Sequence, residues 1–120
     1  MEIYVKFIAH WCRVNETRAA LVYIPCPYVL SEKYAAYAQA FSKYADLAKR
    51  PDLRVHARQL EQISQLYDVP FLDLTDALSE VESRGQWMFN KYDEHMNPHG
   101  YLMVGKLIFS KLFIMKSLEN

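Results

Sequence analysis

The sequence predicts an α/β fold in which a short parallel sheet is flanked by helices. Two short apolar runs, residues 20–24 and 69–74, have the length and the β-branched or aromatic content of buried strands. The segments before, between and after these runs carry apolar residues at the helical spacings of three and four. Strands separated by helices are joined by right-handed crossovers into a parallel sheet that is covered on both faces.

The first helix is expected over residues 2–13, ending near Asn15. Its large apolar residues recur at a spacing of four, although alternation at the start of the segment is also compatible with a strand. The recurring residues are Ile3, Phe7 and Trp11. The first strand follows at 20–24 and must end at Pro25, because proline cannot donate to a strand ladder.

Two helices are expected between the strands. Ser31 is a suitable N-cap for the first, which carries an aromatic stripe that includes Tyr34, Tyr37 and Tyr44. Core packing is the ordinary role of such a stripe, and the alternative is the wall of a ligand cleft. The second helix begins at Pro51, and its buried face is predicted to contain Leu53, Ala57, Leu60, Ile63 and Tyr67.

After the second strand, Thr75 or Asp76 is expected to cap a short helix, and Gly85 to turn the chain into an aromatic-rich loop. Asn97 is predicted to cap the last helix, with Pro98 at its first position. The inward side of this helix is predicted to contain Tyr101, Val104, Ile108, Leu112 and Met115. This order of elements predicts a partial flavodoxin-like three-layer sandwich, because two strands are fewer than an open sheet normally contains.

Length and composition favour one domain over residues 1–120. The chain is 52% hydrophobic and 14% aromatic, which is ample for a core. Its 14 basic and 14 acidic residues give no basic surface for nucleic acid or for an anionic membrane. No signal peptide or bilayer-spanning run is recognised, so a soluble, cytoplasmic chain is expected. Cys12 and Cys26 match neither a disulfide framework nor a zinc site and are expected to be free thiols.

The loop before the last helix contains the candidate chemistry. In open α/β sheets, sites form beyond the carboxyl ends of the strands, in loops that lead into helices. Asp93 and His95 lie two residues apart in such a loop. A histidine base needs its far ring nitrogen held by a carboxylate, and this spacing allows that pairing. A solvated loop without function is the alternative explanation of the spacing.

The spacing of the histidines does not favour a metal site. His95 and His99 are four residues apart, as in a zinc-binding helical pair. Pro98 stands between them at the expected helix start, so the two rings should not share a helical face, and no third ligand is evident. We therefore expect no metal and no cofactor. His99 is then a surface residue, while surface or interhelical packing explains His10 and His56.

Residues 93–100, with the sequence DEHMNPHG and an apolar helix after them, resemble the last conserved block of SGNH (GDSL-type) hydrolases. Residues 21–25 and 71–75 are similar to that family's later strands. The Asp-x-His spacing is most similar to the branch that contains alginate O-acetyltransferase-like proteins. The likeness covers nearly the whole chain, as the C-terminal portion of such a domain.

The resemblance implies an esterase or acyltransferase that acts on ester-linked acyl groups, such as those of O-acetylated carbohydrate or lipid. It gives His95 the role of general base and Asp93 the role of orienting it. The family's Gly-Asp-Ser nucleophile block and its oxyanion-hole blocks are absent, and no serine here follows a strand on a sharp turn.

Two alternatives remain open. One is a non-catalytic interaction module, a truncated half-domain that self-associates. In that case the stripe of Tyr34, Tyr37 and Tyr44 would contact a second copy, as a homo-oligomer, or a missing N-terminal half. The other is a helical protein in which the expected strands are connecting loops.

Overall fold

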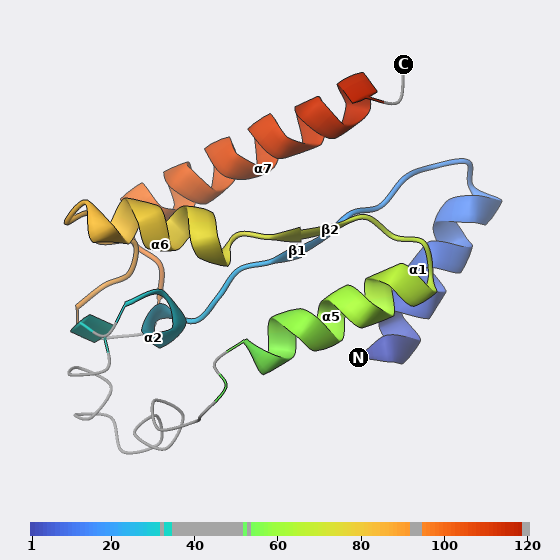
Figure 1. Cartoon of the computed structure of the whole chain (residues 1–120). Helices are drawn as coiled ribbons and strands as arrows, with labels where there is room; N and C mark the ends of the chain where they lie inside the picture. Colours follow the sequence, from blue (N-terminus) through green and yellow to red (C-terminus); the bar gives the residue numbers. More distant parts are fainter. Residues whose placement is uncertain (32, 35–51, 53, 92–94, 119–120) are drawn as a thin grey trace. The chain divides into compact units, whose positions relative to one another are not determined.

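The computed structural model describes residues 1–31, 33–34, 52, 54–91 and 95–118, with the backbone alone for residues 113–118. It is a mixed α/β structure with a short two-stranded parallel sheet (Figure 1). The described parts of the chain form two compact units. Residues 1–23 and 54–73 make the first, and residues from 24–53 and 74–120 make the second.

The first unit contains the sheet and two helices. Its elements are α1 (Glu2–Val14), β1 (Leu21–Tyr23), α5 (Val55–Leu66) and β2 (Phe71–Asp73). The strands pair in parallel with Val22 opposite Leu72, and α5 packs against both strands while α1 packs against α5. Both strand predictions are therefore confirmed, each over a shorter range, and the all-helical alternative is wrong.

Helix α1 confirms the predicted helix but buries a different side from its large apolar stripe. Small or medium side chains line its buried face: Val5, Ala9 and Cys12. Small residues let two helices approach closely, which favours this side for packing on α5. Six large apolar side chains are instead 46% to 76% exposed: Ile3, Tyr4, Phe7, Ile8, Trp11 and Val14.

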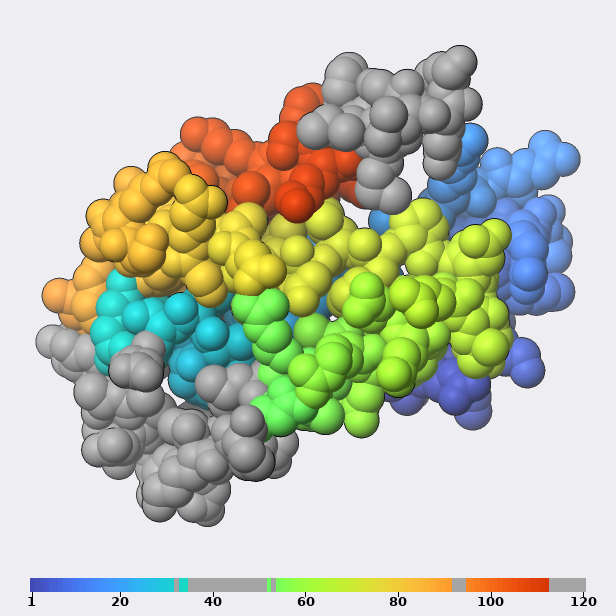
Figure 2. Space-filling view, viewed as in Figure 1, coloured from blue at the N-terminus to red at the C-terminus, as the bar shows by residue number. Residues whose placement is uncertain are grey.

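Helix α5 begins at Val55, four residues later than predicted, after Arg54 at the N-cap position. Ala57 and Ser64 are its buried residues, and the predicted inward residues Leu60 and Ile63 are half-buried. Most of the exposed residues of α5 are polar. Figure 2 shows the surface of this helix in light green. The period of the sequence therefore identified the correct side of this helix.

The second unit contains α2 (Pro27–Leu30), α6 (Thr75–Ser83) and α7 (Pro98–Leu118). Helix α2 packs against α6, and α6 packs against α7. The short helix α2 was not predicted, although Pro27 at its first position suits a helix start. The side chains of Leu74, Leu78 and Met88 are fully buried in this unit and form the centre of its core.

The start of α6 and the inward side of α7 differ from the predictions. Thr75 is a fully buried helical residue, and Leu74, which has no capping side chain, holds the N-cap position. On α7, Val104 is buried as predicted, but Tyr101 is 64% and Leu112 is 37% exposed. Helix α7 is apolar around most of its circumference, so the sequence could not identify its buried side.

The structure confirms an α/β fold with a short parallel sheet. The flavodoxin-like sandwich and the single domain stay predictions. Within the described residues, no helix combines the length and the apolar character that a bilayer crossing requires. Both cysteines are free thiols; Cys12 is buried, but Cys26 is exposed, although both were expected to be buried or half-buried.

Candidate functional site

His95 lies in a short antiparallel hairpin immediately before α7. Residues 88–90 and 95–97 run side by side in this hairpin. Two backbone hydrogen bonds join them and together form the Phe89–Met96 bridge: the Asn90 N–H donates to the His95 carbonyl at 3.0 Å, and the Asn97 N–H donates to the Met88 carbonyl at 2.9 Å. The backbone of His95 is therefore held at its carbonyl, and the residue is exposed.

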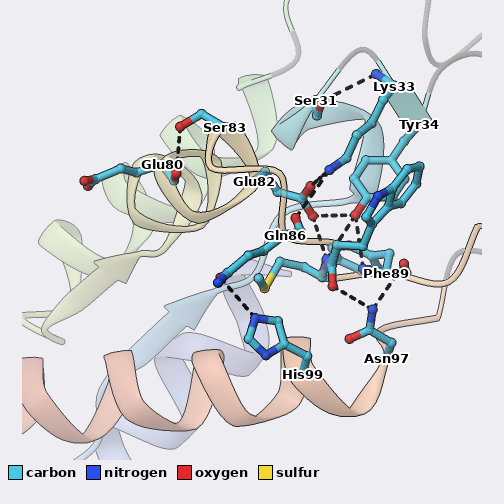
Figure 3. A network of polar contacts seen from close by, with 12 residues as sticks. Ser31, Lys33, Tyr34, Glu80, Glu82, Ser83, Gln86, Phe89, Asn97 and His99 are labelled. Atoms are coloured by element: carbon cyan, nitrogen blue, oxygen red, sulfur yellow. Dashed lines mark hydrogen bonds and ion pairs between the residues drawn. The ribbon is translucent and has the colours of Figure 1, made fainter.

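Asn97 joins this hairpin to the helix, as the sequence predicted for an N-cap. Its Oδ1 accepts the Gly100 N–H at 2.8 Å, which satisfies one of the free amides of the first turn of α7. Its Nδ2 donates to the carbonyls of Trp87 at 2.7 Å and Phe89 at 3.4 Å (Figure 3). One side chain thus holds the helix start and the aromatic loop together.

Gly100 is buried where α7 crosses the hairpin. A Cβ atom at this position would overlap the Met88 carbonyl oxygen and the Met96 side chain. The close approach of the helix to the hairpin therefore depends on the absence of a side chain here. This is a second reason, besides the Asn97 cap, why the hairpin and the helix start form one rigid element.

Of the two predicted catalytic residues, the structure describes one. His95 stands on the pinned hairpin with its side chain exposed. Asp93 lies outside the described residues, so its pairing with His95 stays a prediction.

The four histidines lie on four different elements of the chain. His99 is exposed in the first turn of α7, with its Nε2 3.2 Å from Gln86 Oε1. His95 precedes the helix, so His95 and His99 do not form a helical pair. Across the ranges that the structure describes, no group of three or more potential ligands could hold a metal ion. His10 and His56 are exposed on α1 and α5.

The aromatic loop is held from its other side by a buried carboxylate. Glu82, on α6, is 4% exposed and is the one buried charged side chain among the described residues. Its Oε1 accepts the Met88 N–H at 2.7 Å and the Tyr34 hydroxyl, and its Oε2 pairs with the Lys33 ammonium (Figure 3). A buried carboxylate is tolerated only with such partners.

Tyr34 extends this contact to a second amide of the loop. Its hydroxyl donates to Glu82 and accepts the N–H groups of Met88 and Phe89, each at 3.1 Å. Burial, followed by the hydrogen bond to Glu82, raises the pKa of Tyr34 far above its ordinary value, so the hydroxyl keeps its proton. The ring meets those of Trp87 and Phe89 edge to face, with centroids 5.2 Å and 5.7 Å away.

Lys33 lies on the solvent-exposed side of the contact between Tyr34 and Glu82. Its ammonium pairs with Glu82, donates to the Gln86 carbonyl at 3.3 Å and lies 4.3 Å from the centre of the Trp87 ring. A cation above an indole face is attracted by the ring quadrupole. We refer to Lys33, Tyr34 and Glu82 as the clamp.

The sequence reasoning missed the clamp. Glu82 follows Leu74 and Leu78 at a spacing of four, which places a charged residue on the buried side of α6. A charged residue at a position that the helical period assigns to the buried side was the one feature of the sequence that could have indicated the clamp. Tyr34 is 4% exposed, so it does not belong to an exposed contact surface; Tyr37 and Tyr44 lie outside the described residues.

The arrangement presents one exposed imidazole on a rigid backbone, with a buried polar clamp behind the strand that pairs with it. Such a group can exchange protons with a bound reactant while its backbone stays in place. Comparisons with protein-family models, with curated proteins and with solved structures found no match for this chain.

Proposed function

We propose that this chain supplies the acid/base part of an SGNH-type esterase or acyltransferase, with His95 as the general base. The substrate would be an ester-linked acyl group, such as an O-acetyl group on carbohydrate. The observation that carries the proposal is an exposed His95 whose carbonyl accepts a hydrogen bond from the neighbouring strand, two residues before the Asn97 cap of α7. A general base needs both access to a reactant and a fixed position.

In the proposed reaction, His95 accepts the proton of a serine hydroxyl as the serine oxygen attacks the ester carbonyl. The acyl group is transferred to the serine, and the alcohol leaves with the proton returned by His95. Water or an acceptor hydroxyl then takes the acyl group by the same route in reverse. Asp93 would hold the second ring nitrogen of His95 and fix its tautomer. The serine would come from a second polypeptide segment, since no serine in the sequence is predicted to follow a strand on a sharp turn.

The contacts of the hairpin also bear on the alternative explanation, in which the loop before α7 is solvated and has no function. A loop without function has no need of a capping asparagine that also binds two loop carbonyls. It has no need of a buried glycine at the helix crossing either. These features favour a segment whose conformation matters.

The proposal is tested with p-nitrophenyl acetate, using the purified chain alone and together with the polypeptide encoded directly upstream of it. Replacing His95 by Ala should lower turnover by at least about 100-fold, the lower end of the range for a general base. His99→Ala is the matched control, because His99 is also exposed and only four residues away. It should leave turnover nearly unchanged. Equal rates for the two variants, or no hydrolysis in either mixture, would contradict the proposal.

A second candidate function, a self-associating interaction module, is favoured by the exposed side of α1. Monomers rarely expose a contiguous face of six large apolar side chains. A second copy of the chain is a fitting occupant, because a twofold dimer interface is formed by the same surface patch of both subunits.

Light scattering across a concentration series tests this candidate. A dimer is expected for the native chain and for His10→Glu, which changes a neighbouring polar position of α1. Phe7→Glu, in the middle of the exposed face, should give a monomer. A native chain that is monomeric at every concentration would remove this candidate.

A further inference from the structure

The clamp and His95 are connected through a continuous set of backbone contacts. Glu82 and Tyr34 bind the amides of Met88 and Phe89. The same two loop residues pair with the strand that contains His95, through the Met88 carbonyl and the Phe89–Met96 bridge. Met88 and Phe89 therefore donate their N–H groups to the clamp, while the Met88 carbonyl accepts the Asn97 N–H of the strand that contains His95.

A buried charge at Glu82 is an unusual choice if the site needed only stability. Replacing a buried ion pair by well-packed apolar residues is often neutral or stabilising, because removing two charges from water is costly. Apolar residues could fill the volume, but they could not bind two consecutive amides. The clamp selects one backbone conformation at Met88 and Phe89, since only that conformation brings both N–H groups to the carboxylate and the hydroxyl.

We propose that Glu82 and Tyr34 are positioning residues for His95, acting through the Met88–Phe89 amides and the hairpin. The proposal rests on the role of His95 as the base, and it adds the residues that set where that base stands. Lys33 assists by neutralising Glu82, with its side chain 25% exposed at the edge of the cluster.

The test uses nuclear magnetic resonance on the 120-residue chain, with two readouts that need no turnover. One is hydrogen exchange of the Met88 and Phe89 amides. The other is the position and width of the carbon-bound ring-proton signals of His95, with those of His10 and His56 as internal references.

Tyr34→Phe removes one hydroxyl and keeps the ring. Exchange of the Phe89 amide should become about tenfold faster, as expected when a buried amide loses a hydrogen bond. The His95 ring signals should shift or broaden while the reference signals stay in place. Tyr67→Phe is the matched control, because Tyr67 also donates to a carboxylate, that of Glu2, but in exposed surroundings. It should change neither readout.

A second pair of variants separates positioning from general stabilisation and decides the question if Tyr34→Phe does not fold. Glu82→Gln keeps an oxygen that accepts the Met88 N–H, whereas Glu82→Met fills a similar volume without an acceptor. The His95 signals should be displaced in the Met variant and return toward their native positions in the Gln variant. Identical His95 signals in the two variants, or native signals in a folded Tyr34→Phe, would overturn the proposal.

The two proposals fail in different ways. If the His95 signals respond to the clamp variants but no ester hydrolysis depends on His95, the role of His95 as a general base is contradicted and the positioning of His95 by the clamp is supported. If hydrolysis requires His95 but the His95 ring signals do not change in the clamp variants, the general-base role is supported and the positioning by the clamp is contradicted.

Discussion

Each compact unit contains a tyrosine–glutamate pair among its described residues, and these two pairs differ mainly in burial. Tyr67 donates to Glu2 at 2.7 Å in exposed surroundings in the first unit. Tyr34 donates to Glu82 in the second unit, where each residue is only 4% exposed. The chemistry of the hydrogen bond is the same, so differences in effect between the pairs report on their surroundings.

The comparison shows that burial decides whether a polar pair determines the conformation of the backbone near it. Water can replace either partner of the exposed pair, and its net contribution to stability is small. Water cannot reach the buried pair, so every donor and acceptor there must find a partner within the protein. The partners of the buried pair are two backbone amides, and the pair therefore determines the conformation of the loop that contains them.

The largest effect is expected when the two carboxylates are removed in turn. Glu82→Ala should lower the free energy of unfolding by about 3–5 kcal/mol, because it leaves a buried amide and hydroxyl without their acceptor. Glu2→Ala should leave the urea midpoint nearly unchanged. Equal midpoints for these two variants would show that burial does not distinguish the pairs.

A smaller effect is expected at the crossing of α7 and the hairpin. Gly100→Ala should lower the free energy of unfolding by about 1–3 kcal/mol, because the new Cβ would overlap the Met88 carbonyl and push apart the elements beside the clamp. Gly105, on the exposed side of the same helix, has nothing within 4 Å of an added Cβ. Gly105→Ala should raise stability by roughly 0.5–1 kcal/mol, as for any exposed helical glycine. Thermal unfolding of both variants measures the contrast.

Alkaline pH should separate the two tyrosines by a still smaller amount. The pKa of Tyr34 is raised, first by burial and then by its hydrogen bond to Glu82. Above about pH 10, the unfolded chain releases this proton while the folded chain keeps it, so stability falls as pH rises. The contribution is fully present below that pH. Tyr34→Phe should flatten the alkaline part of the stability curve.

Tyr67→Phe is the control for this curve. The hydrogen bond to Glu2 also raises the pKa of Tyr67, but the group is exposed and solvent screens the effect. The alkaline slope should therefore stay close to that of the native chain. A larger change in Tyr67→Phe than in Tyr34→Phe would contradict the assignment.

The sequence predicted the parts of the fold that depend on local rules. Proline at the end of β1, glycine at φ +82° after α6 and the Asn97 cap of α7 were each identified from one or two residues. The buried sides of α1 and α7 were not, because both helices are apolar around much of their circumference and periodicity alone cannot select a side.

Only one part of the candidate site, His95 and its position before α7, could be predicted from the sequence. His95 and its place before the helix followed from the loop and the N-cap, whereas the clamp depends on contacts between residues about 50 positions apart. Such contacts leave no periodic trace in the sequence. Glu82, at a spacing of four from Leu74 and Leu78 on the buried side of α6, was the local sign of it.

The most direct test of the central claim is the tautomer of His95, read from nitrogen–proton correlations of the ring at a pH where the imidazole is neutral. If Asp93 orients a general base, one tautomer should dominate in the native chain, with the proton on the nitrogen that faces the carboxylate. Asp93→Asn should then redistribute the tautomers while the Asn97 cap and the fold persist. An identical mixture of tautomers in the native chain and in Asp93→Asn would contradict the account.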